Sequence, residues 1–97
     1  MNKNSMQLVT IVCEAMLEPY LERELPALGA EGYTITDARG MGKHMGKRNG
    51  GWRKESNIKV EVLCTDVVAE RLISHVLSKY NDNYALIVYS HERTVYE

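Results

Sequence analysis

The chain of 97 residues has no phenylalanine, one tryptophan, two prolines and two cysteines, and it contains no long apolar run. Cys13 and Cys64 are too few and too far apart for a disulfide framework or a zinc motif, so we expect two reduced thiols. Because no apolar stretch approaches about 20 residues, the sequence predicts neither a membrane span nor a signal peptide. We therefore expect a cytoplasmic protein.

The sequence also lacks the residue combinations that catalysis requires. No nucleophile stands beside a candidate base, and no group of His, Cys and acidic residues has the spacing of metal ligands. A hydrophobic content of 44% and a charged content of 26% are typical of an ordinary globular domain. We therefore predict a single domain over residues 1–97, with no enzymatic activity and no bound metal.

Residues 39–54 hold most of the glycine and half of the positive charge. They contain five glycines and six Lys or Arg residues, with no acid and no Val, Ile or Leu. Such a composition cannot pack a core, so we predict a long surface loop. The rest of a chain of net charge -1 is acidic, which indicates that this loop meets an anionic ligand or partner. A surface loop whose charge only improves solubility is the alternative.

Four segments have the alternation or the β-branched content of strands. Residues 6–13 are apolar on both faces, which is typical of a central strand. The other three predicted strands are 33–38, 57–64 and 85–90, the last followed by a short extended end near 94–96.

Two helices are predicted between these strands. Leucines recur at helical spacing from residue 17 to residue 28, and Gly29 or Gly32 ends the first helix. Pro26 is expected to kink or tighten its last turn. Thr65 or Asp66 caps the second, which runs to residue 79. Its predicted buried stripe is Val68, Leu72, Ile73, Val76 and Leu77.

The resulting order, βαββαβ, predicts an α+β fold of the ferredoxin-like kind. Right-handed crossovers give a four-stranded antiparallel sheet with both helices on one face. The first and third strands are then antiparallel neighbours, so Cys13 and Cys64 lie at opposite edges and cannot form a disulfide. About eighteen residues connect the second strand to the third, where a hairpin usually needs two to five, so this loop is expected to be functional.

Residues 29–43, Gly-Ala-Glu-Gly-Tyr-Thr-Ile-Thr-Asp-Ala-Arg-Gly-Met-Gly-Lys, resemble the strand and T-loop base of the PII signalling superfamily. The resemblance continues in order through most of the chain and places the T-loop at about 39–56. It implies a homotrimer with the ferredoxin-like fold, in which adenine nucleotides bind in clefts between subunits and the loop signals to a partner.

Two departures point to one branch of that superfamily. Residues 79–85, Lys-Tyr-Asn-Asp-Asn-Tyr-Ala, replace the standard phosphate-gripping loop and lack its lysine, and the loop tyrosine that is modified in standard PII proteins has no counterpart. Both resemble carboxysome-associated PII and the PII-like sensors of bicarbonate transporters. This resemblance favours AMP, ADP or cyclic AMP over ATP as effector, with bicarbonate as a further candidate ligand and no tightly bound cofactor.

The resemblance also assigns roles to individual residues. Thr34 would hydrogen-bond adenine, residues 40–43 would line ribose and phosphate, and the backbone around 59–61 would close the adenine pocket, while residues 83–85 and Arg93 would come from the neighbouring subunit. The full predicted nucleotide site is Gly32, Thr34, Arg39, Gly40, Met41, Gly42, Lys43, Lys59, Val60, Glu61, Asn83, Tyr84, Ala85 and Arg93.

The tip of the loop is the predicted partner-binding surface, because an exposed tryptophan among basic residues suits an anchor. By the resemblance, the partner is a membrane transporter or another protein of inorganic-carbon uptake, which would bring the protein to the inner membrane. The predicted partner-binding residues are Lys47, Arg48, Trp52, Arg53 and Lys54.

Three other readings remain open. An acylphosphatase needs an anion-binding loop with an arginine after the first strand, but residues 14–17, Glu-Ala-Met-Leu, have neither glycine nor arginine. A trimeric divalent-cation-tolerance protein would share the fold without a loop of this charge. The six bases suffice for salt-dependent nucleic-acid attachment, but the acidic remainder disfavours it, so no nucleic-acid partner is expected.

Overall fold

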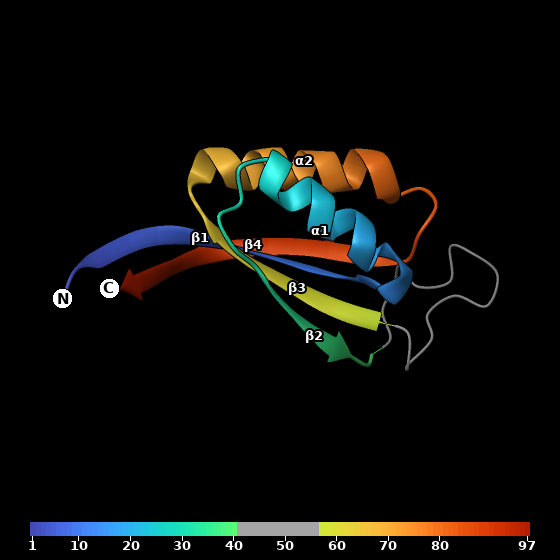
Figure 1. The fold of residues 1–97 in the computed structure, drawn as a ribbon, viewed down its shortest axis with the longest axis horizontal. Helices are drawn as coiled ribbons and strands as arrows, with labels where there is room; N and C mark the ends of the chain where they lie inside the picture. The colour runs from blue at the N-terminus through green and yellow to red at the C-terminus, as the bar shows by residue number, and fades with distance from the viewer. Residues whose placement is uncertain (41–56) are drawn as a thin grey trace.

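The computed structural model describes residues 1–40 and 57–97, and these form one four-stranded sheet covered on one face by two helices (Figure 1). All neighbouring strands are antiparallel, in the order β2-β3-β1-β4. The predicted ferredoxin-like α+β fold is confirmed. The elements are β1 (Lys3–Glu14), η1 (Ala15–Leu17), α1 (Glu18–Ala27), β2 (Thr34–Ala38), β3 (Asn57–Cys64), α2 (Asp66–Tyr80) and β4 (Leu86–Tyr96).

The first and last strands are longer than the sequence predicted. β4 is one strand of 11 residues, where the sequence predicted a break, and β1 has 12 residues. The two pair from Lys3 with Tyr96 to Cys13 with Leu86, whereas β3 reaches along β1 only to Gln7. Their ends therefore form a two-stranded ribbon beyond the sheet (Figure 1). The ribbon was not predicted because most of its residues are exposed and carry no hydrophobic alternation.

The core lies between the helices and the covered face of the sheet. Alternate residues of β1 and β3 point into it, as the predicted alternation of residues 57–64 requires. On α2 the buried row is Ala69, Leu72, Val76 and Tyr80, so the predicted inclusion of Leu77 is wrong: its side chain is 43% exposed. Positions 69, 72, 76 and 80 follow one another at helical spacing, and Leu77 is rotated about 100° away from Val76.

α1 ends as the sequence predicts. The N–H of Gly29 bonds to the carbonyl of Pro26, and that of Ala30 reaches back to Leu25. Gly29 has φ of 109°, which an L side chain rarely adopts. These bonds form the Schellman termination, which confirms the predicted glycine end of the helix, and Pro26 lies inside its last turn.

The two cysteines lie as predicted, apart and unpaired. Cys13 stands opposite Ile58 and Cys64 opposite Gln7, so six positions of the β1–β3 ladder separate them. Both are free and buried. Burial is the main cause that raises the pKa of the Cys13 thiol to about 12. Because the thiolate is the reactive form, this group is a poor nucleophile at neutral pH.

A cluster of charged and polar side chains joins α1 to the C-terminal half of α2. The Glu24 carboxylate of α1 accepts hydrogen bonds from Lys79 Nζ at 2.6 Å and from the Tyr80 hydroxyl at 2.7 Å, and His75 Nε2 lies 2.8 Å away. Burial by itself raises the pKa of Glu24, but the hydrogen bonds from its three partners outweigh it and hold the pKa below its ordinary value of 4.5.

Gly29→Ala should destabilise the protein, because a Cβ there would have a disfavoured φ and would lie 3.1 Å from Val68 Cγ2. We expect a loss of about 1–2 kcal/mol in the free energy of unfolding, measured by urea denaturation. Gly32→Ala is the matched control, since its Cβ would meet nothing within 4 Å. Equal losses for the two variants would contradict this explanation.

Glu24→Gln should lower the free energy of unfolding by about 1–3 kcal/mol at pH 7, because it weakens three hydrogen bonds to a charged acceptor. Since folding lowers the pKa of Glu24, the carboxylate stabilises the fold above pH 4.5 and this contribution is lost as the pH falls through the folded-state pKa. The difference from wild type should therefore shrink as the pH falls below 4.5 and through the folded-state pKa. Urea denaturation at each pH measures it, and a deficit that is constant with pH would exclude this role.

Candidate functional site

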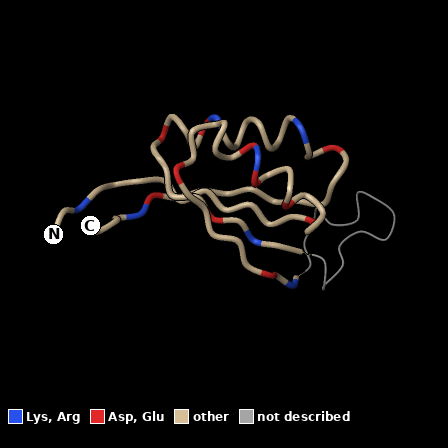
Figure 2. Tube along the Cα trace, viewed as in Figure 1, with Lys and Arg blue, Asp and Glu red and all other residues tan. Residues whose placement is uncertain are grey.

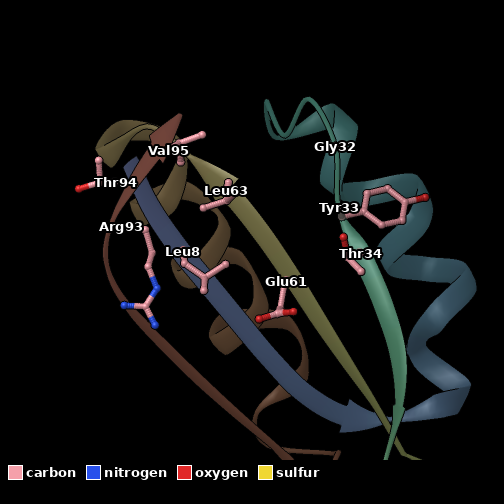
Figure 3. Close-up of a pocket in the computed structure, with 9 residues that line it drawn as sticks. All are labelled: Leu8, Gly32, Tyr33, Thr34, Glu61, Leu63, Arg93, Thr94 and Val95. Carbon is pink, nitrogen blue, oxygen red and sulfur yellow. The ribbon is translucent and has the colours of Figure 1, made fainter. Parts of the chain in front are cut away.

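The uncovered face of the sheet carries a pocket of about 600 Å³ (Figure 3). Its walls come from all four strands and from the two residues before β2. The lining residues are Leu8, Gly32, Tyr33, Thr34, Glu61, Leu63, Arg93, Thr94 and Val95. A volume of this size is typical of sites for small organic ligands.

Strand register places the polar groups of this pocket. Thr34 of β2 stands opposite Glu61 of β3, and Leu63 stands opposite Leu8 of β1. Because side chains two positions apart share a face, Glu61 and Leu63 both point away from the helices. Arg93 comes from β4, where the ribbon leaves the sheet. Its side chain lies on one side of Leu8 and that of Glu61 lies on the other (Figure 3).

The chemistry of this lining suits a flat heterocycle that carries an amino group and an anionic substituent. Leu8 and Leu63 form an apolar base on which a ring can lie. The Glu61 carboxylate accepts hydrogen bonds, the Thr34 hydroxyl both donates and accepts, and the Arg93 guanidinium binds anions. Among the described residues neither charged group makes an ion pair, so both are available to a ligand.

A second group of predicted site residues lies at the other end of the sheet. Arg39 and Gly40 follow β2, whose last residue, Ala38, pairs with Asn57. The turn 81–85 joins α2 to β4 at this end, because Leu86 pairs with Cys13. We call this set, 39–40 with 81–85, the loop-end group. The Glu14 carboxylate reaches it and accepts the Ala85 N–H at 2.7 Å.

The pocket and the turn are too far apart in one chain to hold the same small ligand. Arg93 lies eight residues beyond Ala85, and the intervening residues are nearly all in β4. At about 3.3 Å per residue, the two positions are about 26 Å apart. A single nucleotide that touches both groups would have to lie between two copies of the chain. The separation disagrees with the expectation that residues 83–85 and Arg93 of the same neighbouring subunit contact one nucleotide.

The structure brings together some of the predicted nucleotide-site residues and separates others. Gly32, Thr34, Glu61 and Arg93 line the pocket. Lys59 is two residue pairs further along β3 than Glu61, opposite Thr36. The Val60 side chain is fully buried on the helix side, and the β3 backbone there pairs with strands on both sides. Asn83, Tyr84 and Ala85 belong to the loop-end group.

Eight predicted residues lie outside the part of the chain that the structure describes. Their expected roles therefore stay predictions. They are Met41, Gly42 and Lys43 of the nucleotide site, and Lys47, Arg48, Trp52, Arg53 and Lys54 of the partner-binding surface.

Five residues of the pocket were not predicted from the sequence. The alternation of β3 contained a signal for Leu63, because it shares a face with Glu61. Thr94 and Val95 had no such signal, because the sequence predicted only a short extended end near 94–96 and not its pairing with the start of β1. Leu8 and Tyr33 become pocket residues only once the strands are paired.

Charge is distributed unevenly between the described residues and the rest. The described residues contain seven Lys or Arg and twelve Asp or Glu, and both signs are interspersed over the helices and strands (Figure 2). Among them, no group of three His, Cys, Asp or Glu residues could hold a metal ion. Nor is any helix in the described ranges long and apolar enough to cross a membrane.

Comparison with known proteins identifies the family. The profile described as nitrogen regulatory protein P-II matches residues 6–95. A PII-like signalling protein of Thermus thermophilus is 38% identical, with 98% of this chain and 92% of that chain covered and a TM-score of 0.81. This chain belongs to the PII family. Family members are generally non-enzymatic regulators and typically trimers, and the chain is a PII-like signalling protein.

More distant PII-like structures share the fold. CPII of Thiomonas intermedia, solved with ADP, AMP and acetate, is 17% identical at a TM-score of 0.83, with 100% of this chain and 94% of that chain covered. A second CPII structure, solved with ADP, AMP and bicarbonate, is 16% identical at 0.80, with coverage of 99% and 98%. No curated protein gave a significant match to the chain.

Proposed function

We propose that this PII-like protein binds AMP or ADP in clefts between the subunits of a homotrimer and regulates a partner through residues 41–56. The observation that carries this proposal is the pocket, where Thr34, Glu61 and Arg93 surround an apolar base. Adenine presents an amino donor to Glu61, and its flat ring suits Leu8 and Leu63. Arg93 supplies a cation for phosphate.

The division of site residues into two groups supports binding between subunits. The pocket contains the ring-binding residues and the Arg93 cation, while the loop-end group and the lysine predicted at position 43 supply the rest of the phosphate side. The distance of about 26 Å along β4 prevents residues 83–85 and Arg93 of one subunit from serving one nucleotide. In the proposed trimer, the pocket of one subunit therefore faces the loop-end group of the next.

The open face of the sheet provides a surface for this assembly. Besides the pocket, it exposes large apolar side chains: Leu63 and Ile87 are each 43% exposed and Tyr89 is 47% exposed. Burying such side chains in a subunit interface is favourable by about 25 cal/mol for each Å² of apolar surface. The helices cover the other face, so the open face is the natural contact.

The signalling step would use the glycine-rich basic loop. A nucleotide at the loop base would bind one loop conformation more tightly than another, and the partner would recognise that conformation. Bicarbonate is the second proposed effector, because the related CPII was solved with it. A transporter or another protein of inorganic-carbon uptake is the proposed partner, which would place the protein at the inner membrane when bound.

Wild-type protein should bind AMP and ADP more tightly than ATP in calorimetric titration, and it should prefer AMP to inosine monophosphate. Inosine replaces the amino donor of adenine by a carbonyl acceptor, which the Glu61 carboxylate repels. We expect Glu61→Gln to remove this preference, because an amide can donate or accept. The loss should be about tenfold in the AMP-to-inosine monophosphate ratio.

Two controls make that titration decisive. Glu92→Gln removes the same charge from an exposed side chain of β4 that does not line the pocket. Each titration is repeated with bicarbonate, and with a nucleic acid as an alternative anion. If millimolar AMP, ADP, ATP and cyclic AMP all fail to bind, nucleotide sensing is excluded. An unchanged preference in Glu61→Gln would remove this residue from the adenine site.

Tyr89→Glu should convert the trimer to monomers without unfolding them, because it places a charge on the proposed interface. Tyr20→Glu is a matched control: that tyrosine is 44% exposed but lies on α1, on the covered side of the sheet. Analytical ultracentrifugation measures the mass, and circular dichroism measures the fold. Trimers in both variants would place the interface elsewhere.

A further inference from the structure

The turn 81–85 has few backbone donors left for a ligand. The N–H groups of Asn83 and Tyr84 both bond to the Tyr80 carbonyl, at 3.2 and 3.0 Å, and the N–H of Asn81 bonds to Leu77. The Ala85 N–H donates to the Glu14 carboxylate at 2.7 Å. Four of the five N–H groups of this turn are therefore already hydrogen-bonded within the chain.

The charge of the turn itself is also unfavourable for phosphate. The turn contains one acid, Asp82, and no base. The nearest lysine in sequence, Lys79, donates to Glu24 at 2.6 Å instead. Glu14 itself, at the end of β1, brings a carboxylate oxygen to within hydrogen-bond distance of the turn backbone.

The Glu14 carboxylate thus occupies the position that a phosphate oxygen would take on the Ala85 N–H. Proteins commonly bind phosphate through backbone N–H groups of a turn, because these point at the anion and require no side chain. A side-chain carboxylate is an anion of similar hydrogen-bonding chemistry. While it holds the N–H, an incoming phosphate group finds no donor there and is also repelled by a negative charge.

We propose that Glu14 is a specificity-determining residue that excludes longer phosphate chains from the nucleotide site. The inference rests on the proposed function and gives a physical cause for a preference for AMP and ADP. A nucleotide whose phosphates end before the turn does not meet Glu14. Each further phosphate brings negative charge closer to the carboxylate and to the occupied Ala85 N–H.

The test compares wild type with Glu14→Gln and Glu14→Ala by calorimetric titration with AMP, ADP, ATP and inorganic pyrophosphate. Glu14→Gln keeps the shape and the acceptor but removes the charge, whereas Glu14→Ala also frees the Ala85 N–H. We expect the ATP-to-AMP ratio of dissociation constants to fall about five- to tenfold in Glu14→Ala and less in Glu14→Gln. Pyrophosphate should bind more tightly to both variants, and AMP should be unchanged.

Glu22→Gln and Glu22→Ala are the matched controls, because Glu22 is an exposed carboxylate of α1 and these variants make the same change of charge. Neither should alter the ratio. A selective gain for ATP and pyrophosphate is a result that loss of structure cannot produce. An equal weakening of all ligands would show that Glu14 only stabilises the turn and would overturn the proposal.

The failure of this inference is distinguishable from the failure of the proposed function. If wild type binds none of the nucleotides, nucleotide sensing is excluded, and the pyrophosphate titrations still decide the role of Glu14. Unchanged pyrophosphate binding in both variants would then overturn it. If Glu14→Ala does not fold, Glu14→Gln gives the decision, because it preserves the side-chain volume and the hydrogen bond to Ala85.

Discussion

The pairing of β1 with strands on both sides is the constraint on which the other features depend. β1 joins β3 through eight residue pairs and β4 through eleven, so it fixes the register of the whole sheet. Its alternate residues Val9, Ile11 and Cys13 have no exposed surface and anchor the helices. The intervening positions, Leu8 among them, necessarily point to the open face and form the base of the pocket.

The same strand ends in the residue that organises the loop-end group. Glu14 closes the β1–β3 ladder opposite Asn57 and holds the turn before β4 through Ala85. At its other end β1 continues into the ribbon, which carries Arg93 to the pocket. The two parts of the proposed nucleotide site thus sit at opposite ends of one strand, which gives a physical reason for a site completed between subunits in this PII-like protein.

Most of the fold could be predicted from local patterns. Residues 6–13 indicated a central strand because they are apolar on both faces, and the leucines around Glu18 indicated a helix that ends at Gly29 or Gly32, of which the structure selects Gly29. The ribbon could not be predicted, because residues 91–94 face water and show no apolar alternation. Thr34, Glu61 and Arg93 were named from family resemblance, whereas Leu8, Thr94 and Val95 required the strand register.

The sequence by itself therefore determined the order of elements, the buried face of β3 and the family, because periodicity and motif are local properties of the chain. Only the tertiary structure decided which residues share a pocket, because residues as distant as Leu8 and Arg93 meet through pairing across the sheet. It also decided that the Ala85 N–H is held by Glu14, 71 positions away. No local pattern encodes a hydrogen bond between the end of one strand and a turn that follows two helices.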